Sequence, residues 1–292
     1  ISYLWRPMAI NNLKNQVQNI INLPPLPNIT MEIIGMIDNP NINVQTLSKA
    51  IAKDQVITTK VLKVANSPFF SYPRVISTVD FAITILGFET VKEIVLSASY
   101  IGHFKNYKND QFNTESFWLH LISSSVISRE IAKAIKYPLV GEAFIAGLIH
   151  DIGFFIMSQF FQKEFSQFLE IYATEEKNII QIENEIFGST HAEIGSWLLE
   201  KWNFPPQLVE AVKHHHSPEN ATINPKLTTI IYYTEYFSQN LKIGNFQLED
   251  KIITNFDYLK TIGIDNEQAL VGIYENNKEN FDKELDKTKL LL

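Results

Sequence analysis

Several features are absent from or scarce in this sequence of 292 residues. It has no cysteine, which excludes disulfide bonds, thiol redox chemistry and metal sites built from thiolates. Acidic residues outnumber basic ones, 32 to 25, and there is no basic run, which argues against nucleic acid as the main partner but leaves a small charged ligand open. We see no apolar run long enough to span a bilayer and no signal peptide, whatever precedes Ile1. We therefore expect a cytoplasmic protein that does not insert into a membrane.

Alternating strand patterns are also scarce, whereas apolar residues recur at helical spacing almost throughout, as Ile57, Val61 and Val64 do. Apolar residues make up 45% of the chain, which is enough for a sizeable core. The sequence therefore predicts an all-α protein, with one helical bundle packed against an N-terminal helical subdomain. A polar segment at 105–115, KNYKNDQFNTE, suggests where the two meet. We expect an N-terminal subdomain at 1–112, a bundle at 113–240 and a C-terminal helical extension or tail at 241–292.

The most informative motif is His150-Asp151-Ile152-Gly153, which lies in the apolar stretch GEAFIAGLIHDIGFF. We expect a buried helix from 144 to 160 around it. A buried histidine beside a buried aspartate is costly unless both are satisfied. Imidazole and carboxylate together suit a divalent cation, and one carboxylate can bridge two cations. The pair therefore predicts a metal site of the kind that activates water against a phosphate, with a hydrogen-bonded core histidine as the alternative.

Two more histidines occupy predicted helices upstream and downstream of this motif. His120 lies in ESFWLHLISSSVISREIAKAI, where the helical spacing of apolar residues predicts that its side chain points inward. Thr190 and Glu193 have the spacing of a capping box, which places His191 in the first turn of a helix. For each histidine alone, a buried hydrogen-bonded side chain is the simpler interpretation.

The segment NFPPQLVEAVKHHHSPE follows, and Pro205 or Pro206 is well suited to begin a helix there. His215 and His216 continue the buried side of that helix. Glu235 lies further on, in the apolar segment LTTIIYYTEYF. A buried carboxylate needs a partner, and a metal ion would be one, although a solvated helix charge is the alternative.

The order of these motifs resembles that of the HD superfamily of metal-dependent phosphohydrolases, and in particular its HDOD branch. GSWLLEKWNFPPQLVEAVKHHHSP is similar to that branch's pattern of Gly, paired Leu, Trp, Pro and a His pair followed by Pro. The segment LPPLP at 23–27, Asn66-Ser67 and Leu86-Gly87 resemble the landmarks of its N-terminal half. Several spaced motifs in the right order make the resemblance specific, and together they cover about residues 15 to 240.

The resemblance implies a site for one or two divalent ions, such as Fe, Mn or Zn, with Asp151 as the bridging ligand and, in an active enzyme, a catalytic residue. The implied metal ligands are His120, His150, Asp151, His191, His215, His216 and Glu235. His214 is one histidine more than the family pattern has, and we expect it to be a neighbour of the ligands or a hydrogen-bond donor to one. His103 has no motif around it, and we expect no functional role.

Three residues depart from the family pattern. Gln55 follows Asp54 where Pro is usual, which we interpret as a detail of how a helix begins. Glu235 stands where the last ligand is usually Asp. Phe154 follows the HDIG motif where the catalytically competent HD-GYP relatives carry Lys, and an aromatic ring cannot hold a substrate phosphate as a cation does.

We therefore expect a bacterial-type signal-transduction or output module with a metal-binding, HD-like site and little or no hydrolase activity. Its expected partners are signalling proteins or a small phosphate-containing ligand. The alternative is a dinuclear metal-dependent phosphohydrolase, a phosphodiesterase acting on a nucleotide or cyclic dinucleotide. A third interpretation is a structural scaffold whose histidines are remnants. Phe154 favours the first, whereas the complete set of histidines keeps the second open.

Overall fold

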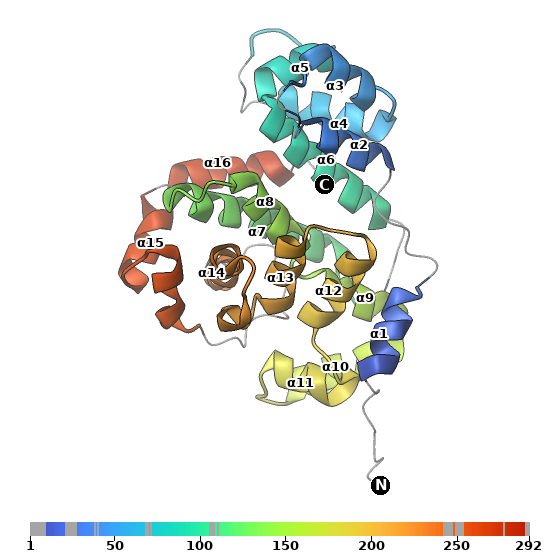
Figure 1. The fold of residues 1–292 in the computed structure, drawn as a ribbon, viewed down its shortest axis with the longest axis vertical. Helices are drawn as coiled ribbons and strands as arrows, with labels where there is room; N and C mark the ends of the chain where they lie inside the picture. Colours follow the sequence, from blue (N-terminus) through green and yellow to red (C-terminus); the bar gives the residue numbers. More distant parts are fainter. Residues whose placement is uncertain are drawn as a thin grey trace. The chain divides into compact units, whose positions relative to one another are not determined.

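The structure is a computed structural model, and it describes residues 10–20, 28–37, 41–67, 72–104, 111–241, 254–276 and 278–289, together with residues 39, 70, 109 and 248. Within these ranges the chain forms helices and turns and no strand, which confirms the predicted all-α class. Contacts divide it into two compact units (Figure 1). The smaller unit comprises residues 24–106 and 274–292, and the larger comprises 1–23 and 107–273.

This division differs from the three consecutive segments that the sequence predicts. The change of unit at 106–107 falls inside the polar segment at 105–115, but the first helix, α1 (Ile10–Gln18), belongs to the larger unit. It packs on α12 (His191–Lys201), where Lys14 Nζ lies 3.1 Å from Glu200 Oε2 and Lys201 Nζ donates to Ile20 O at 2.9 Å. Residues 274–292 are grouped by their contacts with the smaller unit. The apolar face of a short helix reveals that it must be buried but not on which partner.

The smaller unit contains α2 (Asn28–Ile37), α3 (Val44–Ile51), α4 (Gln55–Ala65), α5 (Val79–Leu86), α6 (Phe88–Phe104) and α16 (Lys278–Lys289). Asp54 caps α4, because its side chain accepts a hydrogen bond from Ile57 N, so Gln55 simply occupies the first helical position. Asn66 ends α4, donates to Ile76 O at 2.7 Å and accepts from Ile76 N at 2.8 Å. This amide pins the segment after α4 to the helix. The LPPLP segment lies outside the described residues, as does the side chain of His103.

The larger unit is built around α7 (Thr114–Ala134), which packs against α8 (Val140–Ile149) and α14 (Pro225–Leu241). In the same unit α12 packs against α9 (Ile152–Phe160) and α13 (Pro206–His214). The capping box of Thr190 and Glu193 and the helix start at Pro206 are both confirmed. The unit also contains α10 (Gln162–Thr174), α11 (Ile179–Phe187), η1 (Pro218–Asn220), η4 (Phe256–Ile262) and residues 267–273 of α15 (Glu267–Glu275).

The prediction of one buried helix from 144 to 160 is wrong. Helix α8 ends at Ile149 and α9 begins at Ile152, so His150 and Asp151 occupy a break between two helices. The break contains no proline, and the glycine follows it, so composition did not reveal it. The expectation about apolar length is also wrong: Val140–Phe160, taken as one span of 21 residues, is long and apolar enough to cross a membrane, with a mean hydropathy of 1.6. Because most of this segment is buried, we interpret it as the centre of the core.

Two glycines let helices approach closely in this core. A Cβ at Gly147 would lie 2.6 Å from Ser124 O, so α8 touches the backbone of α7. A Cβ at Gly153 would overlap the carbonyl oxygen of His191 and lie 2.6 Å from its carbonyl carbon. Real Cβ atoms essentially never come within 3.0 Å of such atoms. Gly153 therefore allows the start of α9 to rest on the first residue of α12.

Candidate metal centre

The structure brings together all seven side chains that the resemblance implies as ligands. They come from α7, from the break between α8 and α9, from the first residue of α12, from the two residues after α13, and from α14. Six of these side chains are 0–3% exposed and His216 is 11% exposed. The cluster is therefore almost completely enclosed by the helices of the larger unit.

Asp151 lies at the centre of this cluster. Its Oδ2 atom is 3.3 Å from His120 Nε2 and 3.4 Å from His150 Nε2. Its Oδ1 atom is 3.3 Å from His191 Nε2 and 3.5 Å from His215 Nε2. One carboxylate thus faces a separate pair of imidazoles with each oxygen, an arrangement that would suit a bridging ligand.

Glu235 completes the cluster from α14. Its Oε1 atom is 3.5 Å from His150 Nε2 and 3.3 Å from His215 Nε2, and its Oε2 atom is 3.5 Å from His216 Nδ1. The longer side chain of Glu, compared with the usual Asp, therefore reaches both halves of the cluster. His216 Nε2 also lies 2.9 Å from His191 Nε2.

In His150 and His215 the hydrogen bond made by Nδ1 determines which ring nitrogen carries the proton. His150 Nδ1 lies 2.9 Å from Gly147 O, and His215 Nδ1 lies 2.5 Å from Val212 O. A carbonyl oxygen can only accept, so each Nδ1 carries the proton and, in the neutral ring, each Nε2 presents a lone pair to the cluster. Metal-binding histidines are held in this way, with the other ring nitrogen bonded to a carbonyl or carboxylate.

Glu183 holds His191 by two contacts that sequence reasoning missed. Its Oε1 atom lies 2.6 Å from His191 Nδ1, and its Oε2 atom accepts from His191 N at 3.1 Å. Glu183 is fully buried on α11, between Ile182 and Ile186 on the apolar face of that helix. A carboxylate at an apolar position of a helical pattern was the signal that could have revealed it. Ser238 Oγ, also unforeseen, lies 3.1 Å from His120 Nδ1.

Burial governs the protonation of these rings. It lowers the pKa of His150 to about 3, and it also lowers the pKa of His215 and His216. Burial opposes the charged form of His191 as well, but the charge of Glu183 and the contact with Asp151 outweigh it and raise its pKa to about 10. Neutral imidazole is the form that binds a metal ion, and a cation at His191 Nε2 would take the place of the proton.

Phe154 closes one side of the cluster. It is fully buried, and its ring stacks on His191 with centroids 4.0 Å apart and planes 16° apart. Two lysines near the motifs in the sequence, Lys133 and Lys213, do not take the place of the cation that the HD-GYP relatives carry after the motif. Lys133 Nζ bonds to Glu130 Oε1 at 2.8 Å, and Lys213 is exposed on α13.

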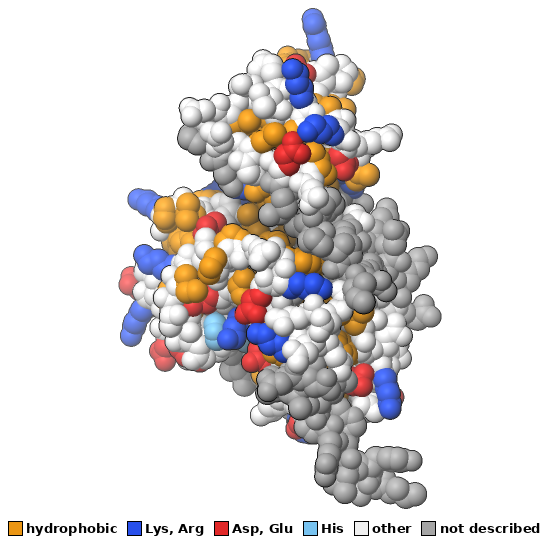
Figure 2. Space-filling view, turned by 45° about the vertical axis from the view of Figure 1, so that its right-hand side comes forward, with side chains coloured by type: hydrophobic (Ala, Val, Ile, Leu, Met, Phe, Trp, Pro, Cys, Tyr) orange, Lys and Arg blue, Asp and Glu red, His pale blue; other side chains and the backbone are white. Residues whose placement is uncertain are grey.

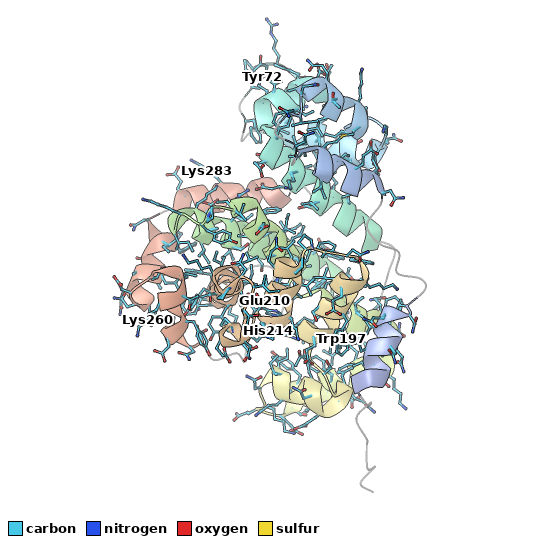
Figure 3. The ribbon with its side chains drawn as sticks, in the orientation of Figure 1. Tyr72, Trp197, Glu210, His214, Lys260 and Lys283 are labelled. Atoms are coloured by element: carbon cyan, nitrogen blue, oxygen red, sulfur yellow. The ribbon has the colours of Figure 1, made fainter. Side chains whose placement is uncertain are left out.

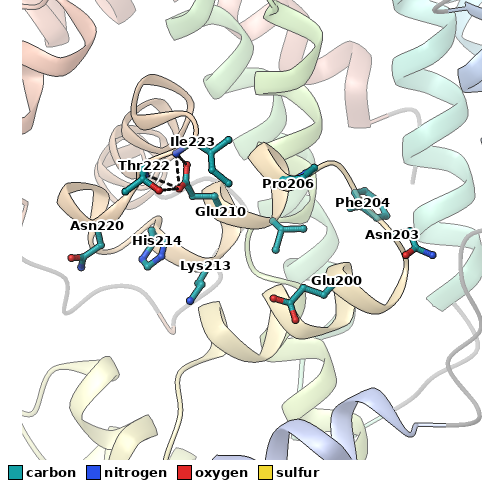
Figure 4. A pocket seen from close by; sticks show the side chains of 11 residues that line it. Glu200, Asn203, Phe204, Pro206, Glu210, Lys213, His214, Asn220, Thr222 and Ile223 are labelled. Carbon is teal, nitrogen blue, oxygen red and sulfur yellow. Dashed lines mark hydrogen bonds between the residues drawn. The ribbon is translucent and has the colours of Figure 1, made fainter.

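His214 lies on another side of α13 from the cluster. With Lys213 and Glu210 it lines a surface hollow of about 600 Å³, shown in close-up in Figure 4, and Figure 3 labels His214 and Glu210 on the same helix. None of the seven clustered residues lines this hollow. Burial and the charge of Lys213 lower the pKa of His214. The expectation that His214 is bonded to a ligand therefore has no support in this arrangement.

The donor set fits a divalent transition metal. Three groups of clustered side chains each have ligand atoms within 4.8 Å of one another, and together they include all seven residues. Five imidazoles and two carboxylates, without thiolate, suit ions such as Fe, Mn and Zn. The convergence of lone pairs and carboxylate oxygens in a buried space is electrostatically unfavourable unless protons or a cation offset it.

Comparison with known proteins gives a family and a fold. A model of the HDOD domain matches residues 23–218. An uncharacterized protein of Treponema pallidum (strain Nichols) is 23% identical over 218 residues, which cover 73% of this chain and 42% of that protein. The chain thus matches less than half the length of this curated relative.

Solved structures share the whole fold. An HDOD domain protein of unknown function from Geobacter sulfurreducens superposes with a TM-score of 0.80 at 22% identity, over 97% of this chain and 99% of that one. A candidate phosphohydrolase from Shewanella amazonensis SB2B gives 0.73 at 24% identity, over 96% and 98%. A candidate signal transduction protein from Marinobacter aquaeolei VT8 gives 0.75 at 20% identity, over 96% and 61%. At these identities the likeness is one of fold.

Proposed function

The chain belongs to the HDOD family, and we propose that it is a signal-transduction or output module whose buried cluster holds one or two divalent ions. The observation that carries the proposal is the convergence of five imidazoles on Asp151 and Glu235. Fe, Mn and Zn are the ions that this donor set suits. The proposed partners are signalling proteins or a small phosphate-containing ligand, and the proposed location is the cytoplasm.

The proposed residues fall into two halves that share one carboxylate. His120 and His150 would hold an ion on the Oδ2 side of Asp151, and His191 and His215 would hold one on the Oδ1 side. Glu235 and His216 would complete the coordination. A bound divalent ion supplies positive charge and lowers the pKa of a coordinated water.

The enclosure of the cluster favours a regulatory or structural role for a bound ion over a catalytic one. Six of the seven side chains are at most 3% exposed, so a phosphodiester has almost no surface through which to reach them. Phe154 covers His191 and contributes no charge to a phosphate. Removing one electrostatic contact of this kind typically lowers a rate by about a hundredfold or more. We therefore expect weak or undetectable hydrolysis.

The second candidate is the dinuclear phosphohydrolase acting on a nucleotide or cyclic dinucleotide. The observation in its favour is that the two oxygens of Asp151 face separate histidine pairs, which would suit a site for two ions. Robust turnover by the metal-loaded protein that disappears in Asp151→Ala would establish it and would overturn the signalling module.

Elemental analysis of protein purified without chelator or affinity-tag metal tests the proposal. We expect about one to two equivalents of a transition metal, as sites with these donors hold. His150→Ala and Asp151→Ala should lose it, whereas His214→Ala, the matched control outside the cluster, should retain it. If the wild-type protein stays metal-free after growth with these ions and loading in vitro, the metal proposal is overturned and the protein is better interpreted as a structural scaffold.

A further inference from the structure

We propose that the larger unit carries a second ligand site, a lysine-lined pocket that binds a small molecule with clustered phosphate groups. The pocket has a volume of about 660 Å³ and lies where the end of α7, the first turn of α14 and η4 meet the start of α15. Three lysines line it: Lys136 just after α7, Lys226 in α14 and Lys260 in η4. None of the seven clustered residues lines it, so the proposal goes beyond the metal centre.

The balance of charge in this pocket is positive. Asp265 is the one carboxylate among its described lining residues, against three lysines. Within the described part of the chain, none of these lysines takes part in an ion pair. The whole chain has a net charge of −7, and Figure 2 shows basic and acidic side chains interspersed over the face it draws. Three unneutralised lysines around one concavity therefore form a local attraction for anions that the overall charge does not supply.

The backbone at the pocket also contributes positive charge. Lys226 is the second residue of α14 and Ala269 lies in the first turn of α15, so two helix N-termini border the pocket. The N-terminus of a helix carries partial positive charge. This partial charge adds to the larger positive charge of the three lysines.

Lys136 occupies a conformation that favours glycine. Its φ is +56°, and it follows α7 where Lys136 N donates to Lys133 O at 3.0 Å and Tyr137 N donates to Ala132 O at 2.8 Å. Helices that end in this pattern usually have glycine at the left-handed position, because a Cβ is strained there. Here the strained position holds a lysine that lines the pocket. Strained residues cluster at functional sites, so we infer that the charge of Lys136 serves ligand binding.

The shape and chemistry of the pocket favour a small phosphate compound. It is an open concavity at the surface, and its volume lies within the roughly 300–1,000 Å³ of small-molecule sites. Lysine is a compact point charge that suits phosphate oxygens. Three such charges match a diphosphate or triphosphate better than a single carboxylate. An acidic peptide is the competing occupant, and the experiment includes it.

Calorimetric titration with inorganic pyrophosphate and with ATP, both without Mg²⁺, tests the site. We expect binding that weakens with added salt and that falls on the order of tenfold in Lys226→Gln and again in Lys260→Gln. Lys163→Gln is the matched control, because Lys163 is an exposed lysine of α10 that does not line the pocket. The metal content of the lysine variants should equal that of the wild type. A failure of the pocket proposal is therefore distinguishable from a failure of the metal-centre proposal.

Lys136→Gly separates a binding role from a structural one. It should raise the melting temperature, since glycine removes the strain, and at the same time weaken pyrophosphate binding. A higher melting temperature with unchanged affinity would overturn the role of Lys136. The whole proposal is overturned by any of three results: no binding of either probe at millimolar concentration, binding that is indifferent to Lys226→Gln and Lys260→Gln, or tighter lysine-dependent binding of an oligoglutamate peptide than of pyrophosphate.

Discussion

Replacement of Gly153 by alanine should damage both the core and the metal centre. The new Cβ would overlap the carbonyl oxygen of His191 and lie 2.6 Å from its carbonyl carbon and 2.8 Å from its Cα. These are backbone atoms at the start of α12, so no side-chain rotation can relieve the overlap. Either α9 or α12 must move, and the movement displaces His191 from Asp151.

The expected change in the free energy of unfolding is the sum of two opposing contributions. Overpacking of a core costs about 1–3 kcal/mol, and backbone overlap of this kind places Gly153→Ala at the upper end. Alanine in place of a helical glycine returns about 1 kcal/mol. We expect a net loss of about 2 kcal/mol in the free energy of unfolding, or a fall of about 4–8 °C in melting temperature for a unit of this size. Metal content should fall as well.

Calorimetry and elemental analysis of the same preparations check this prediction. Gly35→Ala is the matched control, because Gly35 is an exposed residue of α2 with no atom within 4 Å of its added Cβ. It should raise stability by about 0.5–1 kcal/mol. If Gly153→Ala proved as stable as the wild type and kept its full metal content, the close contact between α9 and α12 would be wrong.

Three further predictions concern single side chains. Glu183→Gln should weaken metal binding by about 10–100-fold, measured by competition with a chelator, because Glu183 orients His191. Phe154→Lys should lower the melting temperature and create no phosphodiesterase activity, because Phe154 is fully buried against His191 and a lysine there would be a buried charge. Glu210→Gln should lower stability at neutral pH. Burial raises the pKa of Glu210, but hydrogen bonds from the backbone of 222–224 outweigh this effect and lower the pKa below its ordinary value; Figure 4 draws those from Thr222 and Ile223. Its contribution is therefore present above about pH 4.3, the unfolded value, and is lost as the pH falls through the lower folded pKa, so denaturation curves of wild type and variant should converge in acid.

The sequence by itself determined the helical class and the identity of the clustered residues. Periodicity and capping act over one or two turns, so the start of α12 at Thr190 and the start of α13 at Pro206 were readable from a few neighbouring residues. The order of motifs predicted the seven residues that the structure brings together. Their role as metal ligands stays a prediction.

Only the tertiary structure decided how these residues are arranged and enclosed. The break at His150 and Asp151 has no local signal, because it depends on the contacts of α8 and α9 with different helices. Glu183 and Phe154 meet His191 across the core. The three pocket lysines, likewise, lie far apart in the chain. Such pairings depend on which buried faces pack together, and an apolar face specifies that it must be covered without specifying by what.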